Sequence, residues 1–206
     1  MTAPVLLSLG HGYSARALAA RLLPLGWRVI ATTRSAEKAE ALAAEGAEAL
    51  VWDTATGAGT KAVADAVSAA THLVTSIAPR GDGGEDGAAV ADPALAALGP
   101  AIVARGRGLA WVGYLSTVGV YGDRGGAWVD ETSALKPATP RGQVRVAAEA
   151  AWLALWRAHG LPVHLFRLAG IYGPGRGPFA KVRAGTARRV LKPGQVFSRI
   201  HVEDIA

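Results

Sequence analysis

Short, fully apolar runs alternate with stretches rich in alanine and leucine along the whole chain. Apolar runs of this length are typical of strands that are buried on both faces of a parallel sheet. The stretches between them repeat apolar residues three and four positions apart, which predicts amphipathic helices. We expect strands at residues 5–9, 28–32, 49–52, 72–77, 109–115 and 162–168. The pattern therefore predicts an α/β fold with a Rossmann-type, doubly wound parallel sheet.

Two polar stretches interrupt this alternation. Residues 80–87 combine glycines with acidic side chains, but the acids are not spaced as in a calcium-binding loop, so a solvated turn is favoured over a metal site. Residues 121–141 form a long connection of mixed charge, and such connections often border a ligand site in α/β domains. A long amphipathic helix is expected after it, at residues 144–159.

The composition is that of a folded domain. The chain has 206 residues, half of them apolar, which suits one large domain or one domain plus part of another. No apolar stretch reaches the roughly 18 residues that a membrane span needs, and no export signal is visible. Cysteine is absent, so a disulfide framework and a thiolate metal site are excluded. We expect a soluble, cytoplasmic protein with no membrane partner and no bound metal.

Positive charge is concentrated in the last third of the chain. Residues 1–140 hold 11 Lys and Arg against 13 Asp and Glu, whereas residues 141–206 hold 11 against 3. The basic residues are scattered and lack the interleaved aromatics of a single-strand groove, so no nucleic-acid partner is expected. Two interpretations stay open: attraction for an anionic cofactor or small-molecule substrate, or balancing acids on a downstream segment. A homodimer is one option for the assembly.

The first strand leads into the turn Gly10-His11-Gly12-Tyr13-Ser14-Ala15. Glycines let the chain reverse sharply and bring backbone N–H groups close to a pyrophosphate, whose charge the helix N-terminus then meets. Ala15 is small enough for the helix to pack closely on the strand. A Gly-x-Gly-x-x-Ala turn also fits a purely structural role, but its place after the first strand of a βα series favours dinucleotide binding.

The second strand ends in Thr33-Arg34-Ser35, with no acid in the turn before the arginine. An acid at this place would bind the ribose hydroxyl of NAD, whereas the extra phosphate of NADP needs a cation. The guanidinium of Arg34 and the hydroxyls of Thr33 and Ser35 suit a phosphate. The alternative is an exposed arginine followed by Ser35 as an ordinary helix cap. We expect NADP as the cofactor rather than NAD.

Four stretches of the sequence resemble the short-chain dehydrogenase/reductase superfamily, in particular its extended and atypical members of the NAD-dependent epimerase/dehydratase type. They are residues 9–15, 114–122, 167–176 and 199–204, which follow the family's order. The resemblance implies a Rossmann domain at residues 1–168 and the start of a substrate-binding part at residues 169–206. The substrate lobe is then incomplete, and the chain is expected to be a fragment of a longer protein.

The resemblance also assigns roles to individual residues. It implies that Asp53 meets the adenine and that Thr117 is the hydroxyl that polarises the substrate's oxygen. It further implies that other positions line the cofactor: Ala78 and Pro79 at the adenosine ribose, and Ala169, Gly170 and Ile171 beside the nicotinamide.

The acid/base pair of the family is replaced in this sequence. The family uses a tyrosine together with a lysine one helical turn later, which lowers the tyrosine pKa. Arg141 and Arg145 stand at both positions. An arginine stays protonated near neutral pH and does not shuttle a proton. Arg141 and Arg145, together with Arg176, are candidates for binding a carboxylate or phosphate of the substrate.

His201 is a further catalytic candidate, because histidine titrates near neutral pH. A structural histidine that pairs with Asp204 or with a backbone group is favoured over a catalytic one. Two functions stay open. The favoured one is an oxidoreductase or epimerase/dehydratase that uses NAD(P) on a carbonyl or hydroxyl substrate. The other is a non-catalytic, NADP-binding sensor or regulator, for which loss of the acid/base pair is the expected signature.

Overall fold

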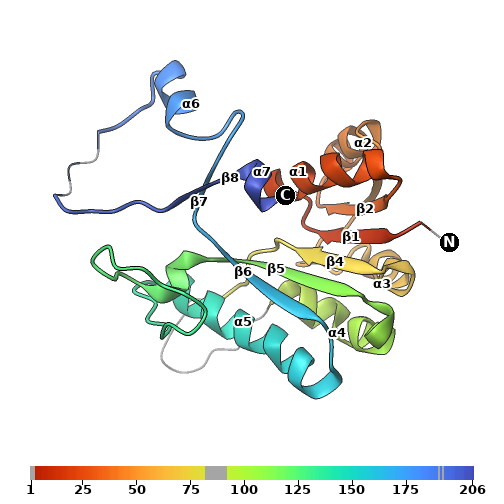
Figure 1. Cartoon of the computed structure of the whole chain (residues 1–206). Helices are drawn as coiled ribbons and strands as arrows, with labels where there is room; N and C mark the ends of the chain where they lie inside the picture. Colours follow the sequence, from red (N-terminus) through yellow and green to blue (C-terminus); the bar gives the residue numbers. More distant parts are fainter. Residues whose placement is uncertain (1–2, 82–91, 190, 192) are drawn as a thin grey trace.

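A computed structural model describes residues 3–81, 92–189, 191 and 193–206. Its main element is a fully parallel, six-stranded sheet in the order β3-β2-β1-β4-β5-β6 (Figure 1). The strands are β1 (Val5–Leu9), β2 (Arg28–Thr33), β3 (Glu48–Val51), β4 (His72–Thr75), β5 (Trp111–Thr117) and β6 (Val163–Leu168). This order defines the doubly wound Rossmann sheet, so the predicted fold class is confirmed.

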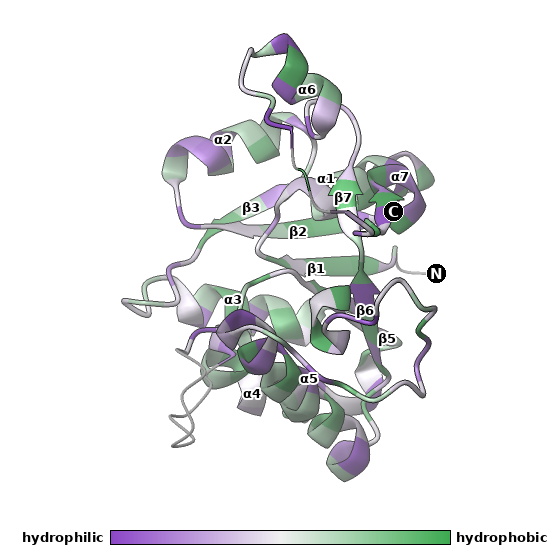
Figure 2. Ribbon diagram, turned by 90° about the vertical axis from the view of Figure 1, so that its left-hand side faces the viewer, coloured by the Kyte–Doolittle hydropathy of each residue, from purple (hydrophilic) through white to green (hydrophobic). Residues whose placement is uncertain are grey.

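Helices connect the strands and cover both faces of the sheet. The longer ones are α1 (Tyr13–Leu22), α2 (Ala36–Ala44), α3 (Thr60–Ala69), α4 (Pro93–Arg105) and α5 (Pro140–His159). Short 3-10 helices are η1 (Leu23–Leu25), η2 (Gly106–Gly108) and η3 (Val118–Tyr121). Figure 2 shows α1 and α2 on one side of the sheet and α3, α4 and α5 on the other.

Two apolar layers hold the helices against the sheet. Trp52 and Trp152, which are almost fully buried, belong to the larger core beneath α3, α4 and α5. Leu6, Ala19 and Leu42 belong to the smaller core beneath α1 and α2. The central strands are therefore covered on both faces, which is why their sequences read as continuous apolar runs rather than as an alternation.

The strand order reverses between β1 and β4, which are neighbours in the sheet but not in the sequence. Leu9 pairs with Thr75 at the carboxyl ends of these two strands. The loops that follow diverge to opposite faces of the sheet, and this leaves a crevice at the switch point, where α/β proteins bind ligands. Since Gly10 follows Leu9 directly, the topology places the glycine loop at this crevice.

Some element boundaries differ from those predicted. β4 ends at Thr75, two residues early, where the Ser76 hydroxyl donates to the carbonyl of Gly10. α5 begins at Pro140, because Thr139 Oγ1 accepts a hydrogen bond of 3.1 Å from Gly142 N and proline suits the first helical position. The predicted polar turn at 80–87 lies mostly outside the described residues.

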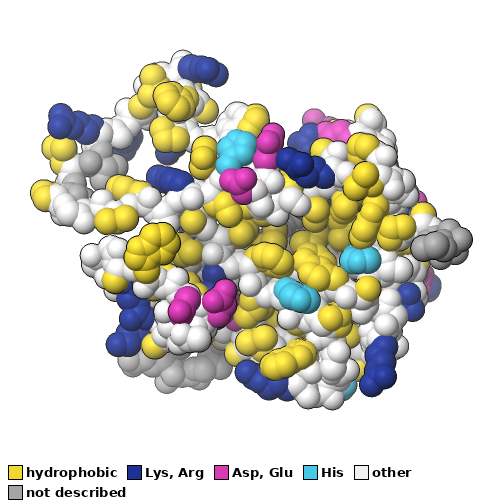
Figure 3. Space-filling view, in the orientation of Figure 1, with side chains coloured by type: hydrophobic (Ala, Val, Ile, Leu, Met, Phe, Trp, Pro, Cys, Tyr) yellow, Lys and Arg dark blue, Asp and Glu magenta, His cyan; other side chains and the backbone are white. Residues whose placement is uncertain are grey.

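Beyond β6 the chain leaves the main sheet. A separate parallel pair, β7 (Gly170–Tyr172) and β8 (Arg199–His201), leads into α7 (Val202–Ile205), which packs against α1. The segment between them, here called the arm, is described at residues 173–189, 191 and 193–198. These residues project from the body and include α6 (Pro178–Arg183) (Figure 1). Lys and Arg side chains stand out on the arm in Figure 3. Elements this short show no clear periodicity, so the sequence pattern did not predict them.

Candidate functional site

Gly10 is locked into the turn by the surrounding fold. Its backbone has φ of +75°, and a Cβ atom there would lie 2.8 Å from the side chain of Ile77. Its N–H donates to Thr32 Oγ1 over 2.8 Å, and its carbonyl accepts from the Ser76 hydroxyl. Only glycine meets both demands, because other residues are strained at this φ and would collide with the residues that follow β4. Gly10 therefore fixes the path of the loop.

Gly12 differs, because nothing in the fold requires a glycine there. Its backbone is extended, with φ of −97° and ψ of −160°, and a Cβ atom would meet only the Gly10 carbonyl oxygen at 3.9 Å. The space above Gly12 is therefore open. Gly12 is also the N-cap of α1, provides no side-chain cap, and leaves a first helical turn without an acid. An anion that approaches the backbone closely fits this cradle.

His11 lies between the two glycines and packs inward. Its Nδ1 lies 2.9 Å from Ser8 Oγ, and Ser8 is fully buried in β1. Burial lowers the pKa of His11 to about 4, against the smaller, opposite effect of the Glu45 carboxylate. The imidazole is therefore neutral at neutral pH and acts as a structural support of the loop.

A cavity of about 550 Å³ opens above the glycine loop. It gathers many of the cofactor residues that the sequence predicts: Gly10, His11, Gly12, Thr33, Arg34, Ala78 and Pro79. The sequence analysis missed a second group that also lines the cavity: Thr32, Lys38, Trp52, Thr54, Ser76, Ile77 and Arg80. Most of the missed residues lie one or two positions from a predicted one. They could have been found by including every residue at the carboxyl ends of β2, β3 and β4.

One end of this cavity is strongly basic. Arg34, Lys38 and Arg80 all line it, although they come from the end of β2, the first turn of α2 and the segment after β4. Arg80 Nη2 donates to Thr54 Oγ1 over 3.1 Å, which fixes its guanidinium across the end of β3. Three exposed cations, one of them anchored by a hydrogen bond, suit a phosphate group.

Other predicted cofactor residues lie around the cavity rather than in its lining. The Asp53 carboxylate accepts a 2.8 Å hydrogen bond from Ala55 N, which lowers the pKa of Asp53, and the charges of Arg34 and Arg80 lower it further. Ser35 Oγ accepts from Lys38 N over 3.3 Å, so Ser35 is the N-cap of α2. Ser14 and Ala15 are buried in the first turn of α1, where Ala15 permits the close packing that the motif predicts.

The residues predicted beside the nicotinamide lie farther along the chain, where it leaves the main sheet. Gly170 and Ile171 belong to β7, and Ala169 connects that strand to β6. All three are partly buried, and they do not line the 550 Å³ cavity. Their role at the nicotinamide therefore stays a prediction.

Thr117 is the last residue of β5 and the N-cap of η3. Its Oγ1 accepts a hydrogen bond of 3.2 Å from Gly119 N. A hydroxyl that accepts a hydrogen bond still holds its own proton for donation. The side chain is only partly buried, so it is available to a substrate oxygen.

Arg141 and Arg145 lie one turn apart at the start of α5, as their spacing predicts. Arg141 is exposed. Arg145 donates to the Tyr114 hydroxyl over 3.0 Å and to the Leu115 carbonyl over 3.4 Å, and its guanidinium lies 5.6 Å from the centre of the Tyr114 ring. Burial raises the pKa of Tyr114 to about 12, so this tyrosine does not replace the missing acid/base tyrosine.

His201 caps α7. Its Nδ1 accepts a hydrogen bond of 3.3 Å from Glu203 N, and its ring meets Tyr172 edge-on at 5.0 Å. This is the backbone-paired arrangement favoured from the sequence, and Nδ1 is occupied by it.

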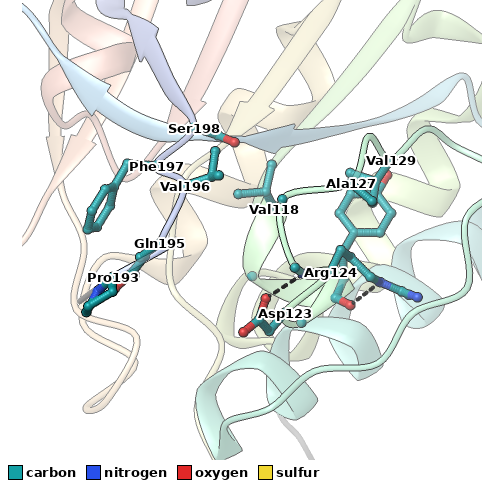
Figure 4. A pocket seen from close by; sticks show the side chains of 16 residues that line it. Val118, Asp123, Arg124, Ala127, Val129, Pro193, Gln195, Val196, Phe197 and Ser198 are labelled. Atoms are coloured by element: carbon teal, nitrogen blue, oxygen red, sulfur yellow. Dashed lines mark hydrogen bonds between the residues drawn. The ribbon is translucent and has the colours of Figure 1, made fainter.

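A second cavity, of about 650 Å³, lies between the segment after β5 and the arm. In Figure 4, Pro193 to Ser198 border one side, and Val118, Asp123 and Arg124 the other. Asp123 accepts from Gly125 N over 2.8 Å, and Arg124 donates to the Tyr121 carbonyl over 3.0 Å, so both charges are used within their own loop. The long connection predicted to border a ligand site thus lines a cavity.

Neither a metal site nor a membrane span is found among the described residues. No group of three or more His, Cys, Asp and Glu side chains in this part of the chain is arranged to hold a metal ion. No helix there is both long and apolar enough to cross a membrane.

Comparisons with known proteins place this geometry in a family. The model of the NAD dependent epimerase/dehydratase family matches residues 6–204. The chain is 52% identical to a functionally unknown conserved protein from Silicibacter pomeroyi DSS, with a TM-score of 0.80, and the match covers 98% of this chain and 65% of that one. Comparison with curated proteins gives no match.

Two more distant structures share the fold. UDP-glucose 4-epimerase from Thermus thermophilus, in complex with NAD, is 20% identical, with a TM-score of 0.71 over 98% of this chain and 71% of that one. dTDP-glucose 4,6-dehydratase from Streptomyces venezuelae, with NAD and TYD bound, is 19% identical, with a TM-score of 0.74 over 98% of this chain and 69% of that one.

The family model extends from β1 to α7 and so includes all four stretches on which the resemblance in the sequence rests. The sheet order and the glycine loop at the switch point agree with it. The chain belongs to the NAD dependent epimerase/dehydratase family.

Proposed function

We propose that this protein binds NADP in the 550 Å³ cavity and acts as an NADP-dependent oxidoreductase or epimerase/dehydratase on a carbonyl or hydroxyl compound. The observation that carries the proposal is the pairing of two features in one cavity. The first feature is the open backbone at Gly12, and the second is the group of cations formed by Arg34, Lys38 and Arg80. A dinucleotide with an additional phosphate presents charges that match both features.

The residues present fit the adenosine half of such a cofactor. A 2′-phosphate is a dianion, and the three cations offer it both charge and directed donors. The same position in an NAD-binding site would place a carboxylate against the ribose hydroxyl. Asp53 is not at that position, because it follows β3 rather than β2, and its Oδ1 accepts a hydrogen bond from Ala55 N in its own turn. These contacts support NADP over NAD.

The chemistry expected at the other end of the cofactor is hydride transfer, since a bound nicotinamide accepts or donates a hydride. In this proposal Thr117 donates its hydroxyl proton in a hydrogen bond to the substrate's oxygen, while Gly119 N holds the Thr117 oxygen in place. A donor aimed at the oxygen on which negative charge develops lowers the barrier. Arg141, exposed in the first turn of α5, stabilises the same charge but does not transfer a proton.

The substrate is proposed to be a small molecule, and Arg141 favours one that carries negative charge. Arg145 is less suited to this purpose, since its side chain is partly buried and its Nη1 already donates to the Tyr114 hydroxyl and the Leu115 carbonyl. The chain spans 65% of the length of the Silicibacter pomeroyi protein.

The test is a titration of the purified protein with NADPH and NADH. Trp52 lines the cavity, so its fluorescence reports occupation directly, and Trp52→Phe identifies that contribution. We expect saturable quenching, with tighter binding of NADPH. Protein that is folded but binds neither dinucleotide would refute the proposal.

Turnover is then measured as NADPH oxidation with a panel of carbonyl compounds. Thr117→Val removes the hydroxyl at nearly constant volume, and we expect it to lower turnover about 10- to 1,000-fold while the affinity for NADPH stays unchanged. Tight NADPH binding with no turnover on any compound, in wild type and variant alike, would instead support the sensor.

A further inference from the structure

The first turn of α1 carries positive potential that the described residues do not balance. The N-terminus of a helix is its positive end, and an acid in the first turn usually offsets it. α1 has no acid there, and its N-cap is Gly12. Arg16, which follows in the same turn, is neutralised by Glu45, whose Oε2 accepts from Arg16 Nε over 3.0 Å.

The arm begins with a tight turn that is fixed on this part of α1. Gly173 N donates to the Arg176 carbonyl over 2.9 Å, and Arg176 N donates to the Gly173 carbonyl over 3.0 Å. The Tyr13 hydroxyl donates to the Pro174 carbonyl over 3.0 Å. A Cβ atom on Gly173 would lie 2.6 Å from the Tyr13 hydroxyl oxygen, so the turn is in close contact with the first residue of α1.

This turn brings another cation to the positive end of the helix. The guanidinium of Arg176 lies 5.3 Å from the centre of the Tyr13 ring. Tyr13 follows Gly12 directly, and no salt bridge among the described residues includes Arg176. A cation near a helix N-terminus is unfavourable in the free protein, and an anion bound between the two removes this cost.

We propose that Arg176 binds the diphosphate of the dinucleotide from the side of the arm, with Tyr13 as its positioning residue. The inference rests on the proposed function and adds Arg176 to the residues that bind the cofactor. In this proposal the diphosphate lies against Gly12 and the first turn of α1. The backbone amides there donate hydrogen bonds but are neutral, and the Arg176 guanidinium adds a full positive charge. The arm thereby takes part in cofactor binding.

The proposal separates Arg176 from Arg34 by the part of the ligand that each binds. Arg176 acts on the diphosphate, which NADPH and NADH share. Arg34 lines the basic end of the cavity and acts on the additional phosphate, which only NADPH carries. Adenosine 2′-monophosphate contains the additional phosphate but no diphosphate, so it reports the Arg34 end alone.

The test uses Arg176→Met, with Arg183→Met as the matched control, because Arg183 is an exposed arginine of the same arm. Dissociation constants are measured by calorimetry for NADPH, NADH and adenosine 2′-monophosphate. For Arg176→Met we expect both dinucleotides to bind about tenfold more weakly and the monophosphate to bind unchanged. Arg183→Met should leave all three constants unchanged.

Tyr13→Phe keeps the ring beneath Arg176 but removes the hydrogen bond to Pro174. We expect a smaller weakening, shared by both dinucleotides and again absent for the monophosphate. Unchanged dinucleotide binding in Arg176→Met, while wild type binds both, would overturn this inference and leave the proposed function intact. UDP is titrated in the same way as a fourth ligand, and a variant that weakens only UDP binding would also overturn the inference, since Arg176 would then bind a nucleoside diphosphate of the substrate. Wild type that binds no dinucleotide would overturn both proposals.

Discussion

Arg145 Nη1 donates to the hydroxyl oxygen of Tyr114 over 3.0 Å. The resemblance in the sequence puts Arg145 at the place of the family's lysine, and in the structure its Nη1 faces the interior of the domain. Tyr114 is fully buried. The pair therefore contributes to the stability of the joint between α5 and β5.

Arg145→Met should destabilise the protein by about 1–3 kcal/mol, because it leaves the buried Tyr114 hydroxyl without a partner. Urea unfolding measures this difference. Adding Tyr114→Phe removes the unpaired hydroxyl and should recover part of the loss. A double variant that is less stable than Arg145→Met would contradict this account.

Substitution of Glu149 should destabilise the protein more than substitution of Arg145. Glu149 is 2% exposed, accepts from Arg167 Nη2 over 2.9 Å, and also accepts from the Ser116 hydroxyl. Glu149→Gln leaves the partly buried Arg167 guanidinium without its counter-charge, which costs about 3 kcal/mol, the lower end of the range for a buried pair. Thermal and urea unfolding measure the change, and Glu131→Gln, at an exposed position, serves as the control. Equal stability of the two variants would contradict this prediction.

The two glycines of the loop should respond to substitution in opposite ways. Gly10→Ala places a Cβ atom 2.8 Å from Ile77 at positive φ, so it should lower stability by about 1–3 kcal/mol. In Gly12→Ala the new methyl group meets open space. Alanine is a poorer helix cap, but it also makes the unfolded chain stiffer, so the free energy of unfolding should change by less than about 1 kcal/mol. Gly12→Ala should nevertheless weaken NADPH binding at least about tenfold, because the methyl group occupies the cradle. Fluorescence titration beside urea unfolding separates the two effects.

The basic end of the cavity should determine the choice between the cofactors. Arg34→Asp should weaken NADPH binding about 100-fold and change NADH binding less than about threefold, since it removes a donor and adds repulsion. Arg80→Met should act in the same direction and more weakly. Arg107→Asp, an exposed arginine in η2, carries the same charge change and is the control. An unchanged ratio of the two dissociation constants in Arg34→Asp would remove the assignment of NADP.

His11 should make the protein less stable in mild acid. Burial lowers its pKa from 6.5 to about 4, so between these values the unfolded chain binds a proton that the folded protein does not. Stability is then complete above pH 6.5 and falls as the pH approaches 4. The loss is about 1–2 kcal/mol after allowance for the partial exposure of the ring. Unfolding measured across this range should show a shallower slope for His11→Gln, and an identical slope would refute the assignment.

The sequence by itself determined the parallel sheet and the glycine loop that follows its first strand. These features depend on local patterns: apolar runs buried on both faces, and glycines directly after β1. The helix cap at Ser35 was predictable for the same reason, because neighbouring residues determine where a helix begins.

Only the tertiary structure decided which distant side chains meet. Lys38 and Arg80 join Arg34 because the ends of β2 and β4 converge on one cavity, and no sequence spacing encodes that meeting. Arg145 belongs to Tyr114 because the packing of α5 on β5 buries a hydroxyl that needs a donor. Arg176 contacts Tyr13 only because the turn that follows β7 packs against the first residue of α1. Long charged side chains take the partners that folding brings near, so their roles follow from the fold and not from their spacing.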